Sequence, residues 1–85
     1  MPTIGIVIYG TSWCGACYRA RKILDQYQIG YRWVNIDSDV EGDRLVKHIN
    51  HGMRSVPTII FEDGSVLVEP AVQVLVTKLA QVDLL

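Results

Sequence analysis

The stretch IGIVIYGTSWCGAC, residues 4–17, decides how this chain folds. Residues 4–9 are almost wholly apolar and rich in β-branched side chains, a composition typical of a strand covered on both faces. The sequence has two cysteines, Cys14 and Cys17, and both lie in the run that follows this strand. From Cys17 onward, apolar residues recur at three- and four-residue steps, which predicts an amphipathic helix. The two thiols therefore lie at a strand-to-helix junction.

This junction favours thiol chemistry. A thiol at the start of a helix faces unpaired backbone N–H groups and the positive end of the helix dipole. Both favour the thiolate, which is the reactive form of cysteine. Cys14 is nearer the solvent side of the helix start and is the expected nucleophile, whereas Cys17 is expected to face the sheet and act as the resolving thiol. The motif predicts dithiol–disulfide exchange.

Alternating strands and helices follow. The first helix is expected to end at Gly30, and the alternation of polar and apolar residues at 31–36 predicts a second strand. Asp39 is placed to cap a second helix, which residues 50–52 end. The apolar residues expected to face the core on the three helices are Ala20, Ile23, Leu24, Tyr27, Leu45, Val46, Ile49, Val72, Leu75, Val76 and Leu79.

The last third of the chain predicts a hairpin and a helix. Residues 57–61 form an apolar run that is turned back at 62–64 into a further strand at 65–68, and Pro70 fits the first turn of a last helix. The order βαβαββα folds most naturally into one mixed sheet with helices on both faces. We therefore expect a single α/β domain over residues 1–85, a three-layer sandwich around a four-stranded sheet.

Composition excludes several classes of partner. The chain has 85 residues, 49% of them hydrophobic, with a formal net charge of -1, and its isoelectric point is about 6.0. No global charge therefore draws it to nucleic acid or to an anionic membrane. We identify neither an export signal nor an apolar run long enough to span a bilayer, and we therefore expect a cytoplasmic protein. In that compartment two closely spaced cysteines suit redox cycling better than structural cross-linking.

Three motifs together carry a resemblance to a known family. YGTSWCGAC at 9–17, RSVPT at 54–58 and DGS at 63–65 resemble the glutaredoxin family of the thioredoxin fold, most closely its mycoredoxin branch. The resemblance extends from Thr3 to about Leu79. It implies a thiol–disulfide oxidoreductase that reduces protein disulfides or protein mixed disulfides, with a low-molecular-weight thiol such as glutathione or mycothiol as cosubstrate. It also implies a monomer with no tightly bound cofactor.

The resemblance implies further site residues. In this fold the proline that matches Pro57 is cis and lies against the cysteine motif, so that the backbone of Val56 is free to pair with an extended thiol peptide. Thr11 and Arg54 flank the same groove and are candidates to bind a carboxylate of the small thiol. Trp13, beside the nucleophile, is expected to shield it.

The chain also departs from the family pattern. Glutaredoxins usually place a lysine at the position of Thr11, an aromatic ring at that of Ala16, and a Gly-Gly with an acidic pair at residues 68–71. The regenerating partner is therefore open between glutathione, mycothiol, another small thiol, and a flavoprotein reductase of the kind that serves thioredoxin-like redoxins.

Metal binding is the alternative from another class. Cys14, Cys17, His48 and His51 offer four ligands for zinc. Thirty residues separate Cys17 from His48, against the usual 12 to 15, which disfavours such a site. An iron–sulfur cluster shared between the Cys14 thiolates of two chains is a second possibility. The acidic residues within 37–43 precede or begin a helix, where acids are favourable, and are expected to be solvated.

Overall fold

The computed structural model describes residues 5–85, and the chain alternates strands and helices as predicted. The elements in order are β1 (Val7–Gly10), α1 (Gly15–Gln26), β2 (Arg32–Asn35), α2 (Val40–Ile49), β3 (Thr58–Ile60), β4 (Val66–Val68) and α3 (Val72–Gln81). Within residues 5–85, every helix falls short of the length and apolarity of a membrane-spanning segment.

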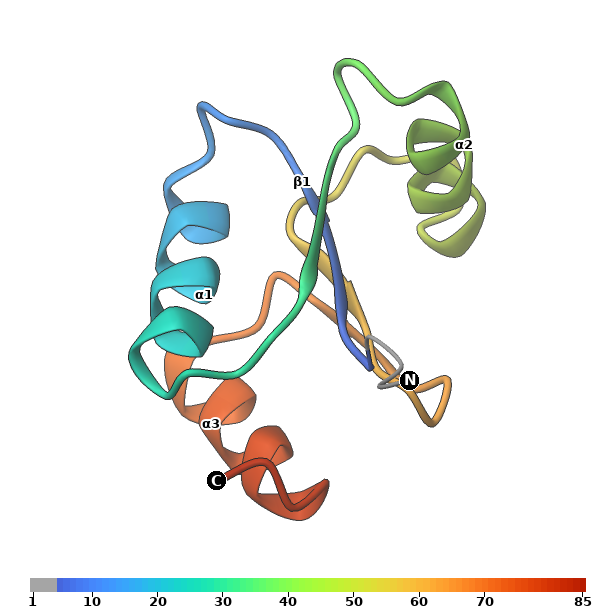
Figure 1. The fold of residues 1–85 in the computed structure, drawn as a ribbon. Coiled ribbons are helices and arrows are strands. Elements are labelled where there is room, and N and C mark those ends of the chain that lie inside the picture. The colour runs from blue at the N-terminus through green and yellow to red at the C-terminus, as the bar shows by residue number, and fades with distance from the viewer. Residues whose placement is uncertain (1–4) are drawn as a thin grey trace.

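The strands form one four-stranded mixed sheet in the order β2-β1-β3-β4. β1 pairs parallel with β2 and antiparallel with β3, and β4 pairs antiparallel with β3. Helices α1 and α3 lie on one side of this sheet and α2 lies on the other (Figure 1). The predicted thioredoxin-like three-layer sandwich is confirmed, with β1 as a central strand.

The main core lies between the sheet and the α1–α3 layer. Successive residues of β1 and its flank alternate, because Ile6 and Ile8 are buried while Val7 and Tyr9 are only half-buried. Burial of each large aliphatic side chain stabilises the fold by roughly 1.5–3 kcal/mol. The buried cluster consists of Ile6, Ile8, Ala20, Leu24, Ile29, Ile59, Phe61, Leu75 and Leu79.

On the opposite face, α2 packs close to the sheet. Asp39 caps this helix as predicted, since its Oδ1 accepts the backbone N–H of Gly42 at 2.8 Å. A Cβ at Gly42 would lie 2.8 Å from Cγ1 of Val34 on β2. Gly42 is a poor helix former, but the absence of a Cβ at this position lets the helix approach the strand.

The first helix and strand differ from the predicted bounds. The strand was expected at residues 4–9; residue 4 lies outside the described residues, and Gly5 and Ile6 precede β1, which starts at Val7. Helix α1 ends at Gln26, before it reaches Gly30. Tyr27 is the C-cap and is exposed, and Gln28 takes a left-handed backbone conformation with φ 58°. The chain turns out of the helix there because the N–H of Ile29 donates to the carbonyl of Leu24 at 2.9 Å.

The last helix also begins later than predicted. Pro70 lies outside its first turn, because Ala71 is the N-cap and α3 starts at Val72. Val72, expected to face the core, is exposed, whereas Leu75 and Leu79 are fully buried. The packing of α3 therefore depends on its middle and final turns.

Candidate active site

Cys14 is the N-cap of α1. Its backbone is extended, at φ -91° and ψ 117°, and its Sγ accepts the backbone N–H of Cys17 at 3.2 Å. This is the contact that serine or aspartate oxygens make at a helix start, here made by sulfur. The helix dipole adds positive potential at the same point. The backbone N–H and the helix dipole both place partial positive charge beside the Cys14 sulfur.

Cys17 lies one turn into the helix and is buried. It is 1% exposed, whereas Cys14 is half-buried, so the predicted placement of the two side chains is confirmed. Burial, followed by the hydrogen bond with Cys14, raises the pKa of Cys17 to about 12. The backbone of Thr11 partly offsets this rise in the pKa. Cys17 therefore remains a protonated thiol at neutral pH.

Gly10 provides the space that the Cys17 sulfur occupies. A Cβ at Gly10 would lie 2.5 Å from Sγ of Cys17 and 2.9 Å from Cη2 of Trp33. Real Cβ atoms do not approach neighbours so closely, so Cys17 and Trp33 can pack here only because residue 10 has no side chain. The last residue of β1 thus leaves room for the buried Cys17 thiol.

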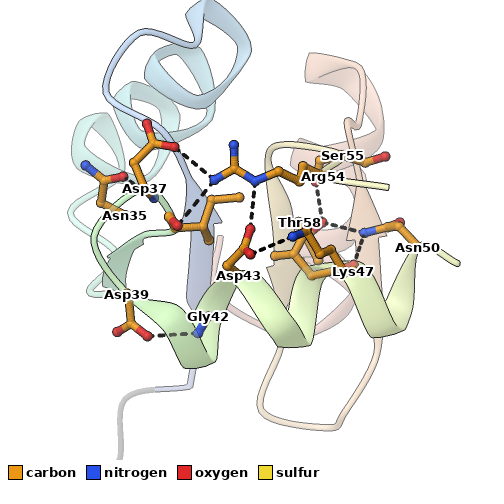
Figure 2. A network of polar contacts seen from close by, with 12 residues as sticks. Asn35, Asp37, Asp39, Gly42, Asp43, Lys47, Asn50, Arg54, Ser55 and Thr58 are labelled. Atoms are coloured by element: carbon orange, nitrogen blue, oxygen red, sulfur yellow. Dashed lines mark hydrogen bonds and ion pairs between the residues drawn. The ribbon is translucent and has the colours of Figure 1, made fainter. Parts of the chain in front are cut away.

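The proline loop forms the other wall beside Cys14. The Val56–Pro57 bond is cis, as the resemblance predicts. The carbonyl of Val56 lies 3.8 Å from Sγ of Cys14. Buried Thr58 holds the loop from behind, since its hydroxyl donates to the carbonyl of Ser55 at 2.7 Å and accepts from Asn50 Nδ2 at 3.1 Å (Figure 2).

Arg54 is held by two carboxylates. Its Nε donates to Asp43 Oδ1 at 2.7 Å, and its Nη2 donates to Asp37 Oδ1 at 2.9 Å and to the carbonyl of Ile36 at 3.3 Å (Figure 2). The hydrogen bond from Arg54 is the largest cause that lowers the pKa of Asp37. Lys47 and then Arg54 lower the pKa of Asp43. A carboxylate of a small thiol would have to compete with these two acids for Arg54.

Trp13 and Thr11 occupy contrasting environments. Trp13 is 71% exposed, and its indole Nε1 donates to Asp37 Oδ2 at 2.9 Å. Thr11 is buried, and its hydroxyl has no hydrogen-bond partner within residues 5–85. The hydroxyl is shut off from solvent, so a carboxylate contact from Thr11 stays a prediction that its backbone would have to fulfil.

Sequence reasoning did not identify Asp37 and Asp43 as partners of Arg54. The acidic run was expected to be solvated, yet these two side chains hold the arginine of the proline loop. A signal was available, because the carboxyl ends of parallel β1 and β2 meet at one edge of the sheet. Asp37 follows β2 at the edge where Cys14 follows β1.

The four candidate zinc ligands do not come together within residues 5–85. Across residues 5–85, no three His, Cys, Asp or Glu side chains come together as metal ligands. His48 and His51 are exposed near the end of α2. A cluster shared between two chains concerns an assembly and stays a prediction.

Comparison with known proteins agrees with this geometry. The glutaredoxin family model matches residues 6–66. This chain belongs to the glutaredoxin family. A Mycobacterium tuberculosis protein named as a glutaredoxin is 38% identical over 82 residues, which is 96% of this chain and 98% of that protein. Mycoredoxin 1 of Corynebacterium glutamicum is 34% identical over 74 residues, 87% of this chain and 91% of that protein.

Solved structures share the fold of this glutaredoxin at low sequence identity. Wheat glutaredoxin has a TM-score of 0.73 at 18% identity, and the match covers 98% of this chain and 79% of that chain. A variant of the thioredoxin-like protein BC3987 has a TM-score of 0.78 at 14% identity, with 98% and 100% covered. Family membership makes this glutaredoxin a thiol–disulfide oxidoreductase.

Proposed function

We propose that this glutaredoxin reduces protein disulfides and protein mixed disulfides with Cys14 as nucleophile, Cys17 as resolving thiol and a low-molecular-weight thiol as reductant. The observation that carries the proposal is the position of Cys14 Sγ, which caps α1 and accepts the N–H of Cys17 at 3.2 Å. At this position Cys14 is half-buried and can be reached by a substrate, whereas Cys17 is buried.

The first step is an exchange at one sulfur. The Cys14 thiolate attacks a sulfur of the substrate disulfide, a new S–S bond forms, and the substrate S–S bond breaks. The released thiolate takes a proton from solvent. Cys17 does not compete in this step, because its pKa of about 12 keeps its proton in place.

Two second steps complete the cycle. In the first route, the substrate is a protein mixed disulfide and Cys14 has taken up its small thiol; a second small thiol, as thiolate, attacks that Cys14 mixed disulfide, forms an oxidised small-molecule disulfide and restores the Cys14 thiolate. In the second route, Cys17 attacks Cys14, its proton passes to the displaced thiolate, and a Cys14–Cys17 disulfide forms. Two further small thiols, or a reductase, then reduce that disulfide.

The residues around Cys14 indicate what we expect to bind there. We place an extended peptide against the backbone of Val56 and Pro57, with Trp13 as an exposed aromatic contact. Arg54 is a candidate for a carboxylate of the small thiol, although Asp37 and Asp43 already bind it.

Relatives support a small thiol as the cosubstrate. One similar protein is named mycoredoxin, and a structurally similar buckwheat glutaredoxin was solved in complex with glutathione, at a TM-score of 0.64 and 21% identity. We propose glutathione, mycothiol or a similar thiol as reductant, a cytoplasmic location, and a monomeric enzyme that acts on disulfide-containing or thiolated proteins. A flavoprotein reductase as electron donor is the competing route.

Two cysteine variants test the mechanism. Cys14→Ser should abolish turnover of a mixed-disulfide peptide, while Cys17→Ser should keep it within about twofold of wild type and lose the dithiol route. The peptide is offered first with glutathione and then with mycothiol attached, and a thioredoxin reductase is tested as donor last. Equal loss of activity in both variants would rule out the mixed-disulfide route.

A further inference from the structure

The carboxylate of Asp37 joins two loops that lie on either side of the candidate groove. Its Oδ2 accepts the indole N–H of Trp13 at 2.9 Å, and its Oδ1 accepts Nη2 of Arg54 at 2.9 Å. Trp13 lies in the loop between β1 and α1, and Arg54 lies in the loop between α2 and β3. Asp37 itself comes from the loop between β2 and α2, so one side chain connects three loops. Figure 2 shows its contact with Arg54.

In the proposed function, these loops carry atoms that contact the substrate. Trp13 directly precedes Cys14, and Arg54 is two residues before Val56, whose carbonyl is 3.8 Å from Cys14 Sγ. We propose that Asp37 is a positioning residue that fixes the spacing between the Trp13 loop and the Val56–Pro57 loop, and so controls the binding of protein substrates. This inference rests on the proposed function of the groove.

Asp37 is well anchored for this role. Its backbone N–H donates to Asn35 Oδ1 at 2.9 Å, and the N–H groups of Ser38 and Asp39 donate to the carbonyl of Asn35 at 3.1 and 3.0 Å. These bonds fix the turn that follows β2. The bridge therefore ties both groove loops to a rigid strand end.

The bridge contributes more to geometry than to folding stability. The side chains of Asp37 and Arg54 are each 39% exposed, and ion pairs at such positions add little to stability. The hydrogen bonds from Arg54 and then Trp13 lower the pKa of Asp37, so its carboxylate stays ionised at neutral pH. Small displacements of binding groups can nonetheless cost large factors in turnover.

Asp37 and Asp43 offer a matched comparison. Both bind Arg54, but Trp13 donates to Asp37. Loss of Asp43 leaves the connection between the two groove loops in place. Loss of Asp37 breaks it, while Arg54 keeps Asp43 and the carbonyl of Ile36. Asp25, an exposed acid of α1, serves as a control for surface charge.

The experiment measures kcat and KM for a peptide that carries glutathione as a mixed disulfide, for wild type, Asp37→Ala, Asp37→Asn, Asp43→Asn and Asp25→Asn. Asp37→Ala should raise KM about fivefold or more with kcat within about twofold, because the groove loses its spacing and Cys14 keeps its helix cap. Asp43→Asn should raise KM less than Asp37→Ala, and Asp25→Asn should match wild type.

Nuclear magnetic resonance of the indole N–H groups gives an independent readout. The Trp13 signal, assigned with a Trp13→Phe variant, should shift and exchange faster with solvent in Asp37→Ala but not in Asp43→Asn. Asp37→Asn keeps an acceptor for the indole and loses the charge for Arg54, so its indole signal should stay closer to wild type than that of Asp37→Ala.

Several outcomes would overturn the inference. These are an unchanged KM in both Asp37 variants, an equal rise in KM for Asp43→Asn, a fall in kcat without a change in KM, and an unchanged Trp13 signal in Asp37→Ala. A wild-type protein without activity on the peptide would instead refute the proposed function, and the inference would fall with it.

Discussion

Substitution of Gly10 by alanine tests how closely the inner thiol is packed. The added Cβ would lie 2.5 Å from Cys17 Sγ, 2.9 Å from Cη2 and 3.1 Å from Cζ3 of Trp33. Cys17 is 1% exposed and lies on a helix that packs against the main core, so its sulfur cannot move away freely. Extra volume at such a buried position typically costs about 1–3 kcal/mol.

This cost should outweigh the usual benefit of replacing glycine. Alanine stabilises a compatible site by about 0.4–1 kcal/mol through the unfolded chain. The net cost is then about 0.5–2.5 kcal/mol. Because a domain of this size loses about 4–8 °C in Tm per kcal/mol, Gly10→Ala should lower Tm by about 2–20 °C. Thermal unfolding followed by circular dichroism measures this change.

Gly30 provides the matched control. A Cβ at Gly30 would meet nothing within 4 Å, so Gly30→Ala should leave Tm unchanged or raise it. Combining Gly10→Ala with Cys17→Ala removes the closest of the three atoms and should recover part of the lost stability. A Tm for Gly10→Ala within 2 °C of wild type would refute the reasoning, because the thiol would then have room to spare.

Two further predictions concern pH and backbone conformation. The pKa of Cys17 is raised from 9.0 to about 12, so above pH 9 the unfolded chain loses a proton that the folded protein keeps. The free energy of unfolding should therefore fall as the pH rises from 9 to 12, and urea titrations should show a shallower fall for Cys17→Ala; equal slopes would contradict the assignment. Glu69 has φ 47° and its N–H donates to the carbonyl of Pro57 at 2.8 Å, so Glu69→Gly should relieve left-handed strain and raise stability by up to about 1 kcal/mol in the same assay, whereas Glu69→Ala should not. A less stable Glu69→Gly variant would mean that the side chain contributes more than the strain costs.

The sequence predicts the fold well because its signals are local. The apolar run of β1, the periodic residues of α1 and the Asp39 cap each act within a few positions of the chain. Parallel pairing of the first two strands follows from the helix between them. The ends of helices were predicted less well. The left-handed turn at Gln28 depends on a hydrogen bond between Ile29 and Leu24 that has no marker in composition.

The candidate site likewise has features that the sequence predicts and features that depend on the assembled fold. The placement of Cys14 and Cys17 follows from helical spacing, and the cis form of Pro57 follows from the family resemblance. The partners of Arg54 are 11 and 17 residues away along the chain, so only the assembled sheet edge brings them together. Burial of Thr11 likewise depends on how the loop after β1 folds back.

The difference in exposure between the two cysteines also determines which of them is modified by oxidants and alkylating reagents. Alkylating reagents and peroxides reach sulfur from solvent, and in the reduced fold they meet Cys14, because Cys17 is 1% exposed. A sulfenic acid formed on Cys14 would have Cys17 close at hand to condense with it, before harsher oxidation makes the damage permanent. Buried Cys17 thus keeps the oxidation of Cys14 at a stage that reduction can reverse.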